Sequence, residues 1–238
     1  MVNWFDYNGI NSYIDLEALV QSKNIFSSPA PDLSTLKIPG RSGDLIEDNN
    51  RFDNVDAVYT CAVLTKGDFA EAARKIRTTL LAKPGDYKRL ADSYDANYFR
   101  WAVIKKSIQI DQLGRYDGTC KVTFNCKPYF YSFAGQIVKT ITAPCTLINY
   151  ENTEAQPLLK LYGSGAITLE INGKAFTLSA VNEFIEIDSE RLTVYKGREN
   201  AAAATNCQEF PMLLPGKNSI TWRGNVQRLE ITPRWRAL

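Results

Sequence analysis

Hydrophobic and polar residues alternate with a period of two along most of the chain, which is typical of half-buried β-strands. In the clearest strand, Val122, Phe124 and Cys126 share one face and polar residues take the other. Pro128 ends this strand, because proline has no ladder donor and restricts the residue before it. The aromatic cluster at 129–133 then predicts a seam between two packed domains.

One stretch, from Asp68 to Lys83, instead repeats at helical spacing. Asp68 is suited to cap the helix, with Glu71 three positions later, and Pro84 stops it. Its apolar stripe consists of Phe69, Ala72, Ala73, Ile76 and Leu80. We expect one amphipathic helix, packed through this stripe against the strands of the first half.

The rest of the first half is predicted to be strands and turns. Residues 27–33 read as a loop, because two prolines in three residues cannot join a ladder. The stretch 36–45 reads as a tight turn that holds Arg41 out. Strands are expected around Trp4 and Phe5 and at 52–64, 87–90, 98–106 and 108–110. One helix against many strands predicts an α+β or helix-decorated sandwich.

The second half carries strand patterns without a helix. Hairpins are expected at Asn172-Gly173, at the turn 188–191 and around 223–225, and an exposed loop is expected at 197–206. Seven or eight short antiparallel strands predict a β-sandwich of jelly-roll type. The fold class is therefore mainly β.

Length and composition agree with two ordinary globular domains, which we place at 1–133 and 134–238. The chain has 238 residues, 45% hydrophobic and 23% charged, with a net charge of +2. Such a balance gives no reason to expect nucleic-acid binding, and no run is long enough to insert into a membrane. Residues 1–13 lack the pattern of a secretory signal, so we expect a soluble protein made in the cytoplasm.

The chain has no histidine, which removes the commonest general base and metal ligand. We therefore expect neither catalysis, nor a metal, nor a cofactor. The five cysteines lack zinc-site spacing and are odd in number, so they are expected to be buried free thiols. They are Cys61, Cys120, Cys126, Cys145 and Cys207.

Several polar and aromatic side chains have a functional and a structural interpretation. Arg41 could clamp a phosphate or carboxylate, form a subunit contact or be a solvated turn residue. Arg74 and Arg77 could form a subunit contact or be solvated surface cations. Trp222 and Trp235 could stack on a sugar or fill a core.

Three carboxylates are open to the same choice. Glu183, Glu186 and Asp188 could serve a glycosidase or form the polar face of a strand.

An ordered set of short motifs runs through nearly the whole chain. The motifs are 38–45 (IPGRSGDL), 124–131 (FNCKPYFY), 171–173 (ING), 185–188 (IEID), 195–197 (YKG), 210–211 (FP), 214–216 (LPG) and 221–225 (TWRGN). In this order the sequence resembles the distal tail proteins of long-tailed, non-contractile phages.

That resemblance implies a ring-forming N-terminal domain and a galectin-like C-terminal β-sandwich. It further implies a structural protein of the virion tail tip, a homo-hexameric ring that connects the tail tube to the host-adhesion device. The partners implied are the tail tube protein, the tail-associated fibre or lysin protein and the receptor-binding protein. Trp4, Phe5, Arg41, Arg74 and Arg77 are then the expected subunit-interface residues, since a ring closes through head-to-tail contacts. The alternative is a carbohydrate-binding module that recognises the host surface through the C-terminal sandwich.

Overall fold

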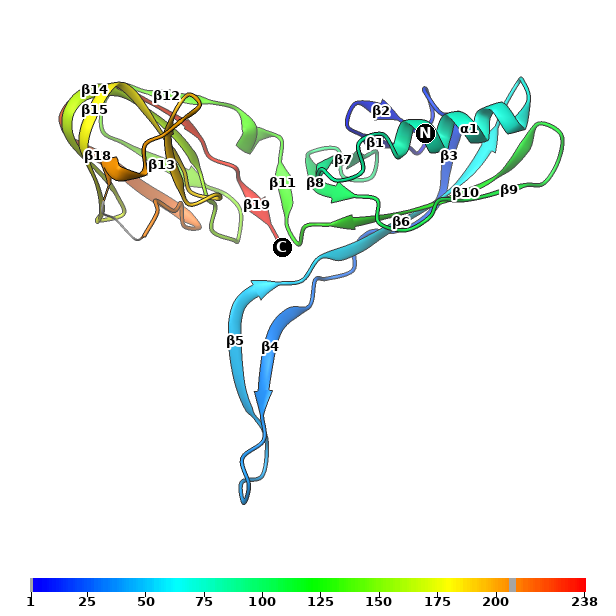
Figure 1. Cartoon of the computed structure of the whole chain (residues 1–238), viewed down its shortest axis with the longest axis horizontal. Coiled ribbons are helices and arrows are strands. Elements are labelled where there is room, and N and C mark those ends of the chain that lie inside the picture. The colour runs from blue at the N-terminus through cyan, green and yellow to red at the C-terminus, as the bar shows by residue number, and fades with distance from the viewer. Residues whose placement is uncertain (1, 206–208) are drawn as a thin grey trace. The chain divides into compact units, whose positions relative to one another are not determined.

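The chain forms two compact units, 1–130 together with Leu238, and 131–237. The computed structural model shown in Figure 1 describes residues 2–205 and 209–238, so Cys207 lies outside the described residues. The sequence-based boundary was placed after Phe133. The prediction of a mainly β protein is confirmed, because strands make up most of both units and the described residues contain one α-helix.

The first unit is built on one antiparallel sheet. Its strands run in the order β2-β1-β7-β8-β10-β6-β3, with β9 beside β10. The strands are β1 (Phe5–Tyr7), β2 (Ile10–Asn11), β3 (Ala18–Asn24), β6 (Val55–Leu64), β7 (Lys88–Asp92), β8 (Tyr98–Val103), β9 (Gln109–Gln112) and β10 (Asp117–Cys126). The longest ladder joins β6 to β10 over ten residue pairs, from Leu64–Asp117 to Val55–Cys126.

The single helix, α1 (Phe69–Leu80), occupies the predicted stretch. The Asp68 carboxylate accepts a hydrogen bond from the Ala70 backbone N–H, which confirms the predicted N-cap. Phe69, Ala72, Ile76 and Leu80 are buried, so the apolar stripe faces the core of the unit.

Three aromatic rings from different parts of the chain meet in that core. The Phe5 ring lies 5.1 Å from that of Tyr59 and 5.3 Å from that of Phe124, between centroids. The Tyr59 hydroxyl donates a 2.7 Å hydrogen bond to the buried Asp92 carboxylate. The carboxylate in turn accepts hydrogen bonds from the backbone N–H groups of Tyr94 and Asp95, which fixes the turn after β7.

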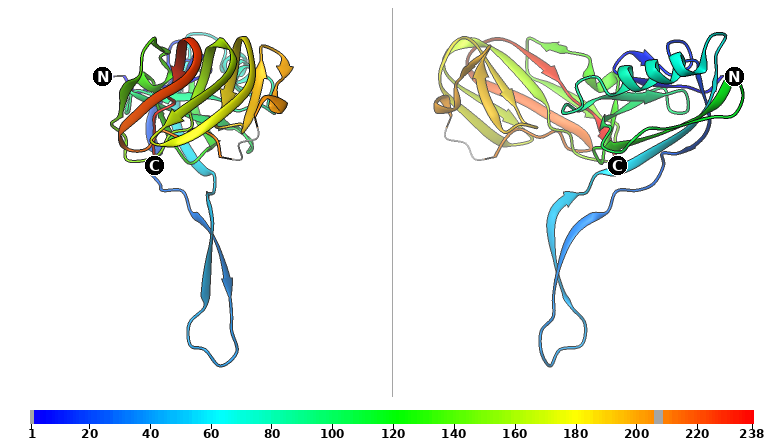
Figure 2. Two further views of the ribbon diagram at one scale, coloured as in Figure 1. Left: turned by 90° about the vertical axis from the view of Figure 1, so that its left-hand side faces the viewer. Right: turned by 45° about the vertical axis from the view of Figure 1, so that its right-hand side comes forward.

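Between β3 and β6 the chain forms a separate two-stranded sheet, β4 (Pro31–Leu36) and β5 (Leu45–Phe52), which we call the arm (Figures 1 and 2). The prediction of a loop at 27–33 is wrong for residues 31–33, which belong to β4. Pro31 is tolerated because it is the first residue of a strand that has a partner on one side only. Positions 37–44 connect the two strands, so Arg41 lies in the loop of the arm.

The second unit has its own sheet, in the order β12-β18-β14-β15-β16-β17, with β13 also pairing β18. Its strands are β12 (Lys139–Ile141), β13 (Cys145–Asn149), β14 (Leu158–Ile171), β15 (Lys174–Asp188), β16 (Thr193–Lys196), β17 (Glu199–Asn200) and β18 (Gly216–Thr232). Outside this sheet, β11 (Phe130–Ser132) pairs with β19 (Arg236–Ala237). Two 3-10 turns, η1 (Ala134–Gln136) and η2 (Ala202–Ala204), complete it, and β17 and η2 replace part of the predicted loop at 197–206.

Three strands of this unit are long and bent where short strands were predicted. The expected hairpin around 223–225 is wrong, because β18 runs on from Gly216 to Thr232 through the bend. Gly224 has a φ of +103°, which lets the strand change direction without reversing. At the facing bend in β14, a Cβ on Gly163 would lie 2.2 Å from the Asn225 carbonyl oxygen. The two glycines therefore let single strands turn the corner of the sandwich.

The other two predicted hairpins are confirmed. Ile171 pairs with Lys174 across Asn172-Gly173, and both turn residues have positive φ, 55° and 79°. The turn after Asp188 joins β15 to β16, and Asp188 pairs with Thr193.

Candidate functional site

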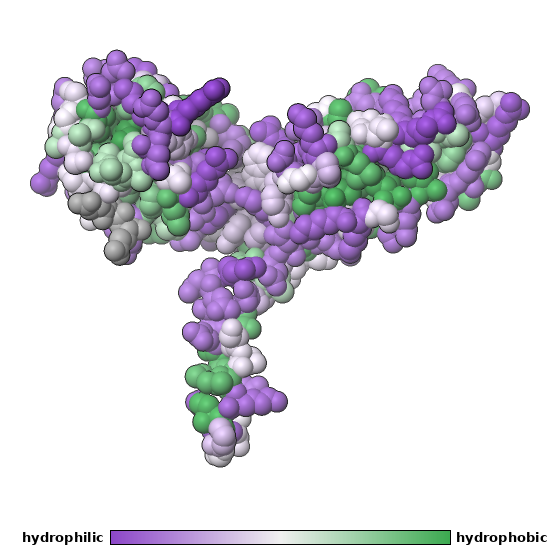
Figure 3. Space-filling model, viewed as in Figure 1, coloured by the Kyte–Doolittle hydropathy of each residue, from purple (hydrophilic) through white to green (hydrophobic). Residues whose placement is uncertain are grey.

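The arm is the most exposed regular structure in the first unit. Leu36 lies opposite Leu45, and Thr35 lies opposite Ile46. Directly opposed residues of antiparallel strands share a face, and neighbours along a strand alternate between faces. The arm therefore has apolar side chains on both faces, and Figure 3 shows them as hydrophobic surface along its lower half.

The loop of the arm carries Arg41 in the position that the sequence predicted. Its backbone N–H bonds to the Ile38 carbonyl at 3.2 Å, and the residue is exposed. At the base of the arm, Arg51 lies 3.3 Å from Asp32 and 2.9 Å from Asp53, measured between nitrogen and oxygen. The base is thus fixed by ion pairs while the loop presents its cation to solvent.

The other predicted interface residues lie at different depths. Arg74 and Arg77 are exposed on α1, and Trp4 is half-buried. Phe5 is 1% exposed in the core of the unit, so its ring offers no surface to another subunit. These residues come from different elements of the first unit: Trp4 from the segment before β1, Phe5 from β1, Arg41 from the loop of the arm, and Arg74 and Arg77 from α1.

The two tryptophans proposed for sugar stacking belong mainly to the core of the second unit. Trp235 is 6% exposed and packs among the buried residues. Trp222, on β18, is half-buried and packs against the same cluster. Only Trp222 keeps ring surface that a sugar could reach.

The three carboxylates considered for hydrolysis all have basic or backbone partners. Glu183 pairs with Lys196 at 3.2 Å, and Glu186 accepts a hydrogen bond from the Gly197 backbone N–H at 3.0 Å. Asp188 is buried, and its carboxylate accepts hydrogen bonds from Nη1 and Nη2 of Arg234, at 2.7 and 3.1 Å. These contacts give each carboxylate a structural role.

Asp188 is the most strongly constrained of these groups. Burial by itself would raise the pKa of Asp188, but the hydrogen bonds and charge of Arg234 outweigh it and hold the pKa below its ordinary value. The carboxylate also accepts hydrogen bonds from the backbone N–H groups of Glu190 and Arg191. Asp188 is therefore an ionised anchor that fixes the β15–β16 turn to the C-terminal segment.

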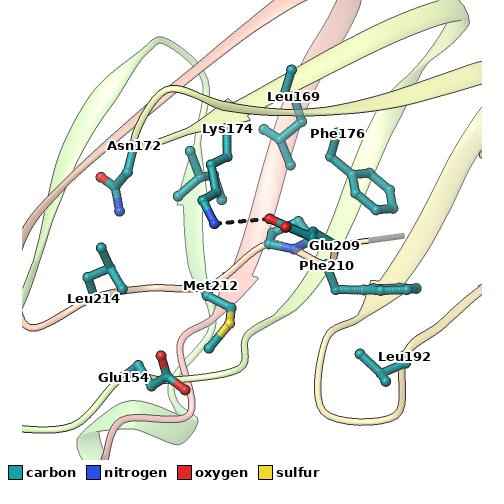
Figure 4. A pocket seen from close by; sticks show the side chains of 13 residues that line it. Glu154, Leu169, Asn172, Lys174, Phe176, Leu192, Glu209, Phe210, Met212 and Leu214 are labelled. Atoms are coloured by element: carbon teal, nitrogen blue, oxygen red, sulfur yellow. Dashed lines mark hydrogen bonds and ion pairs between the residues drawn. The ribbon is translucent and has the colours of Figure 1, made fainter. Parts of the chain in front are cut away.

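A pocket of about 460 Å³ opens beside the β14–β15 hairpin of the second unit (Figure 4). Its walls are largely apolar, and Lys174 pairs with Glu209 at its rim, with Nζ 3.0 Å from Oε2. The lining includes Leu169, Ile171, Phe176, Phe210, Met212 and Leu214. Such a lining accepts apolar groups, whereas a sugar requires several convergent hydrogen-bonding groups.

A buried asparagine holds one wall of this pocket in place. The Asn218 side chain accepts a 2.7 Å hydrogen bond from the Leu214 backbone N–H. It also donates hydrogen bonds to the carbonyl oxygens of Leu214 and Gly216. It also accepts a hydrogen bond from the Asn172 side chain at 2.7 Å. Local sequence patterns predict the hairpin and the turn-rich segment 210–216 separately, but no local pattern indicates that they face each other.

The described residues contain no constellation suited to metal binding. No group of three or more histidine, cysteine, aspartate or glutamate side chains among them could hold a metal ion. Burial raises the pKa of the Cys61 and Cys120 thiols to about 12, so neither is a ready nucleophile. Within the same described residues, every helix is too short or too polar to cross a membrane.

Comparison with solved structures identifies the fold. The chain is similar to the crystal structure of the SPP1 Dit protein (gp 19.1), described as a paradigm of the hub adsorption apparatus in phages that infect Gram-positive bacteria. The TM-score is 0.74 and the identity 13%, covering 97% of this chain and 98% of that one. It is also similar to a chain in the structure of the phage P2 baseplate in its activated, calcium-bound conformation. That match has a TM-score of 0.51 and 10% identity, and it covers 97% of this chain and 98% of the other.

These matches confirm, at the level of the fold, the predicted resemblance to distal tail proteins. No protein-family model and no curated protein sequence matches the chain. At 13% identity the common feature is the arrangement of strands over both units. The fold is that of a phage tail hub protein.

Proposed function

We infer that this chain is a structural component of a phage tail tip, in which copies close into a homo-hexameric ring. The ring joins the tail tube to the adhesion device, and the first unit forms it. The partners are the tail tube protein, the tail-associated fibre or lysin protein and the receptor-binding protein. The likeness of the whole chain to hub and baseplate proteins supports this function.

The observation that carries the proposal is the arm. A two-stranded hairpin is at best marginally stable in water by itself. This arm also exposes leucine and isoleucine side chains on both faces, which is unfavourable unless another surface covers them. A subunit that mates head to tail with its neighbour supplies such a surface.

Size-exclusion chromatography with light scattering on the purified wild-type chain and on Arg41→Glu tests the proposal. The wild type is expected to elute as a closed oligomer with the mass of six chains. Arg41→Glu is expected to shift the mass towards the monomer, because the loop of the arm then carries the opposite charge into the contact. Unchanged assembly of Arg41→Glu would remove this arginine from the interface, and a wild type that remains a monomer would contradict the ring.

A further inference from the structure

The apolar pocket of the second unit adjoins a second cavity that carries basic side chains. This second cavity has a volume of about 510 Å³ and is lined by the β16–β17 hairpin, and Leu192 lines both cavities. Leu192 is 63% exposed in the turn before β16, and its φ of +52° is unfavourable for a leucine. The turn therefore holds this side chain at the boundary between the two cavities, at some cost in backbone energy.

The charged side chains that line the apolar pocket already have partners of opposite sign. Lys174 pairs with Glu209 at the rim, and Glu154 lies 3.9 Å from Nη2 of Arg236, between oxygen and nitrogen. The remaining lining is largely apolar, and the volume of about 460 Å³ lies within the range of small-molecule sites, roughly 300 to 1,000 Å³. The pocket is therefore suited to an apolar group and supplies no spare charge of its own.

The second cavity, in contrast, has cations available for a ligand. Arg198 is exposed and forms no ion pair with any carboxylate among the described residues. Nε of Arg191 lies 3.8 Å from the Asp188 carboxylate, which is already bonded to Arg234 and to two backbone N–H groups. Two arginines and the single carboxylate of Glu199 give the described lining a net charge of +1.

We propose that the second unit binds a single-chain amphiphile with an anionic headgroup. Its alkyl chain occupies the apolar pocket, and its headgroup reaches Arg191 and Arg198 past Leu192. Burial of the chain favours binding, and a guanidinium fork matches the two oxygens of a carboxylate or phosphate. The site uses neither the arm nor α1, so it does not depend on the proposed ring.

Isothermal titration calorimetry on the full chain tests this site with octanoate and octyl phosphate. Each is expected to bind at one site per chain. Octanol, which has the same chain without the charge, should bind at least tenfold more weakly than octanoate. Acetate, which has the headgroup without the chain, should not compete.

Matched variants assign the binding to the two cavities. Arg198→Gln should weaken octanoate binding at least fivefold and leave octanol binding unchanged. Arg223→Gln is the control, because Arg223 is exposed on β18 and lines neither cavity, and it should change neither affinity. Leu214→Glu places a carboxylate on a pocket residue that is 47% exposed, and it should abolish octanoate binding. Should thermal unfolding show that Leu214→Glu is not folded, Arg198→Gln decides alone.

Three outcomes would overturn the proposal. They are no binding of octanoate or octyl phosphate, equal affinities for octanol and octanoate, and octanoate binding that Arg198→Gln leaves unchanged. Vesicles of phosphatidylglycerol should not sediment the chain, because a pocket of this size takes a single alkyl chain. Sedimentation with vesicles and no octanoate binding would indicate a membrane contact instead. Octanoate binding by a chain that never assembles would contradict only the proposed ring.

Discussion

Individual side chains in this protein mostly serve packing and anchoring. Cys61 and Cys120 are directly opposed across β6 and β10, and both are buried with Cys126 in the core of the first unit. Their burial agrees with the expectation of free thiols drawn from the odd cysteine count. The buried Asp188 carboxylate is paired with the Arg234 guanidinium, as buried charges in proteins require.

The thiols give a prediction about pH. Because burial raises the pKa of Cys61 and Cys120 to about 12, and that of Cys126 to about 11, they should not react with a thiol reagent in the native protein at pH 8. In the unfolded chain they ionise near pH 8.5. The unfolded state then holds fewer protons, so the free energy of unfolding should fall as the pH rises from about 8.5 towards 12.

Mapping the labelled cysteines by mass spectrometry, with and without denaturant, checks this prediction. Cys145, which is half-buried, is the internal comparison and should react before the other three. Rapid labelling of Cys61 in the native protein would contradict the buried position.

The buried ion pair gives a second prediction at this scale. Arg234→Met leaves the Asp188 carboxylate buried without its main partner, which should lower the free energy of unfolding at pH 7 by about 3–5 kcal/mol. In the wild type the pKa of Asp188 is lowered, so its stabilising contribution is present above about pH 4 and is lost as the pH falls through the lowered value. In Arg234→Met this loss should disappear, because the unpaired buried carboxyl gains from protonation.

Urea unfolding at pH 3, 5 and 7, followed by tryptophan fluorescence, measures both effects. Arg191→Met is the matched control, since Arg191 is exposed and its Nε lies 3.8 Å from Asp188. Its effect should stay below about 1 kcal/mol. Equal losses in the two variants would count against the special role of Arg234.

At the scale of elements, local patterns were sufficient where one stretch of chain determines its own structure. The helix after Asp68 and the hairpin at Asn172-Gly173 follow from capping and turn chemistry, and both are confirmed. The errors come from positions where a distant segment decides. The glycine at position 224 is compatible with a tight turn and with a bend in one strand. The pairing of β14 with β18 on both sides of Gly224 shows that β18 continues through a bend.

The arm was missed for a related reason. Prolines in the stretch 27–33 suggested a loop, because a proline cannot occupy a central strand. β4 pairs only with β5, so the restriction did not apply to Pro31. The pocket beside the β14–β15 hairpin could not be predicted, because its walls are far apart in the sequence.

The bend in β14 gives a prediction for this scale. Gly163→Ala would place a Cβ 2.2 Å from the Asn225 carbonyl oxygen, so β14 and β18 must move apart. The free energy of unfolding should fall by about 1–3 kcal/mol. Gly85→Ala is the matched control, because a Cβ there meets nothing within 4 Å and the change should stay within about 0.5 kcal/mol. Thermal unfolding followed by circular dichroism compares the two variants.

At the scale of the whole molecule, each unit has its own hydrophobic core. The candidate contact surface of the first unit is its exposed arm. The ordered motifs of the sequence predict this fold, and the similarity of both units to a hub protein agrees with them.

Negative-stain electron microscopy of the purified chain tests the central claim most directly. The proposed ring predicts class averages of a six-fold ring with a central hole, and loss of these rings in Arg41→Glu. A field of single chains at every concentration of the wild-type protein would contradict it.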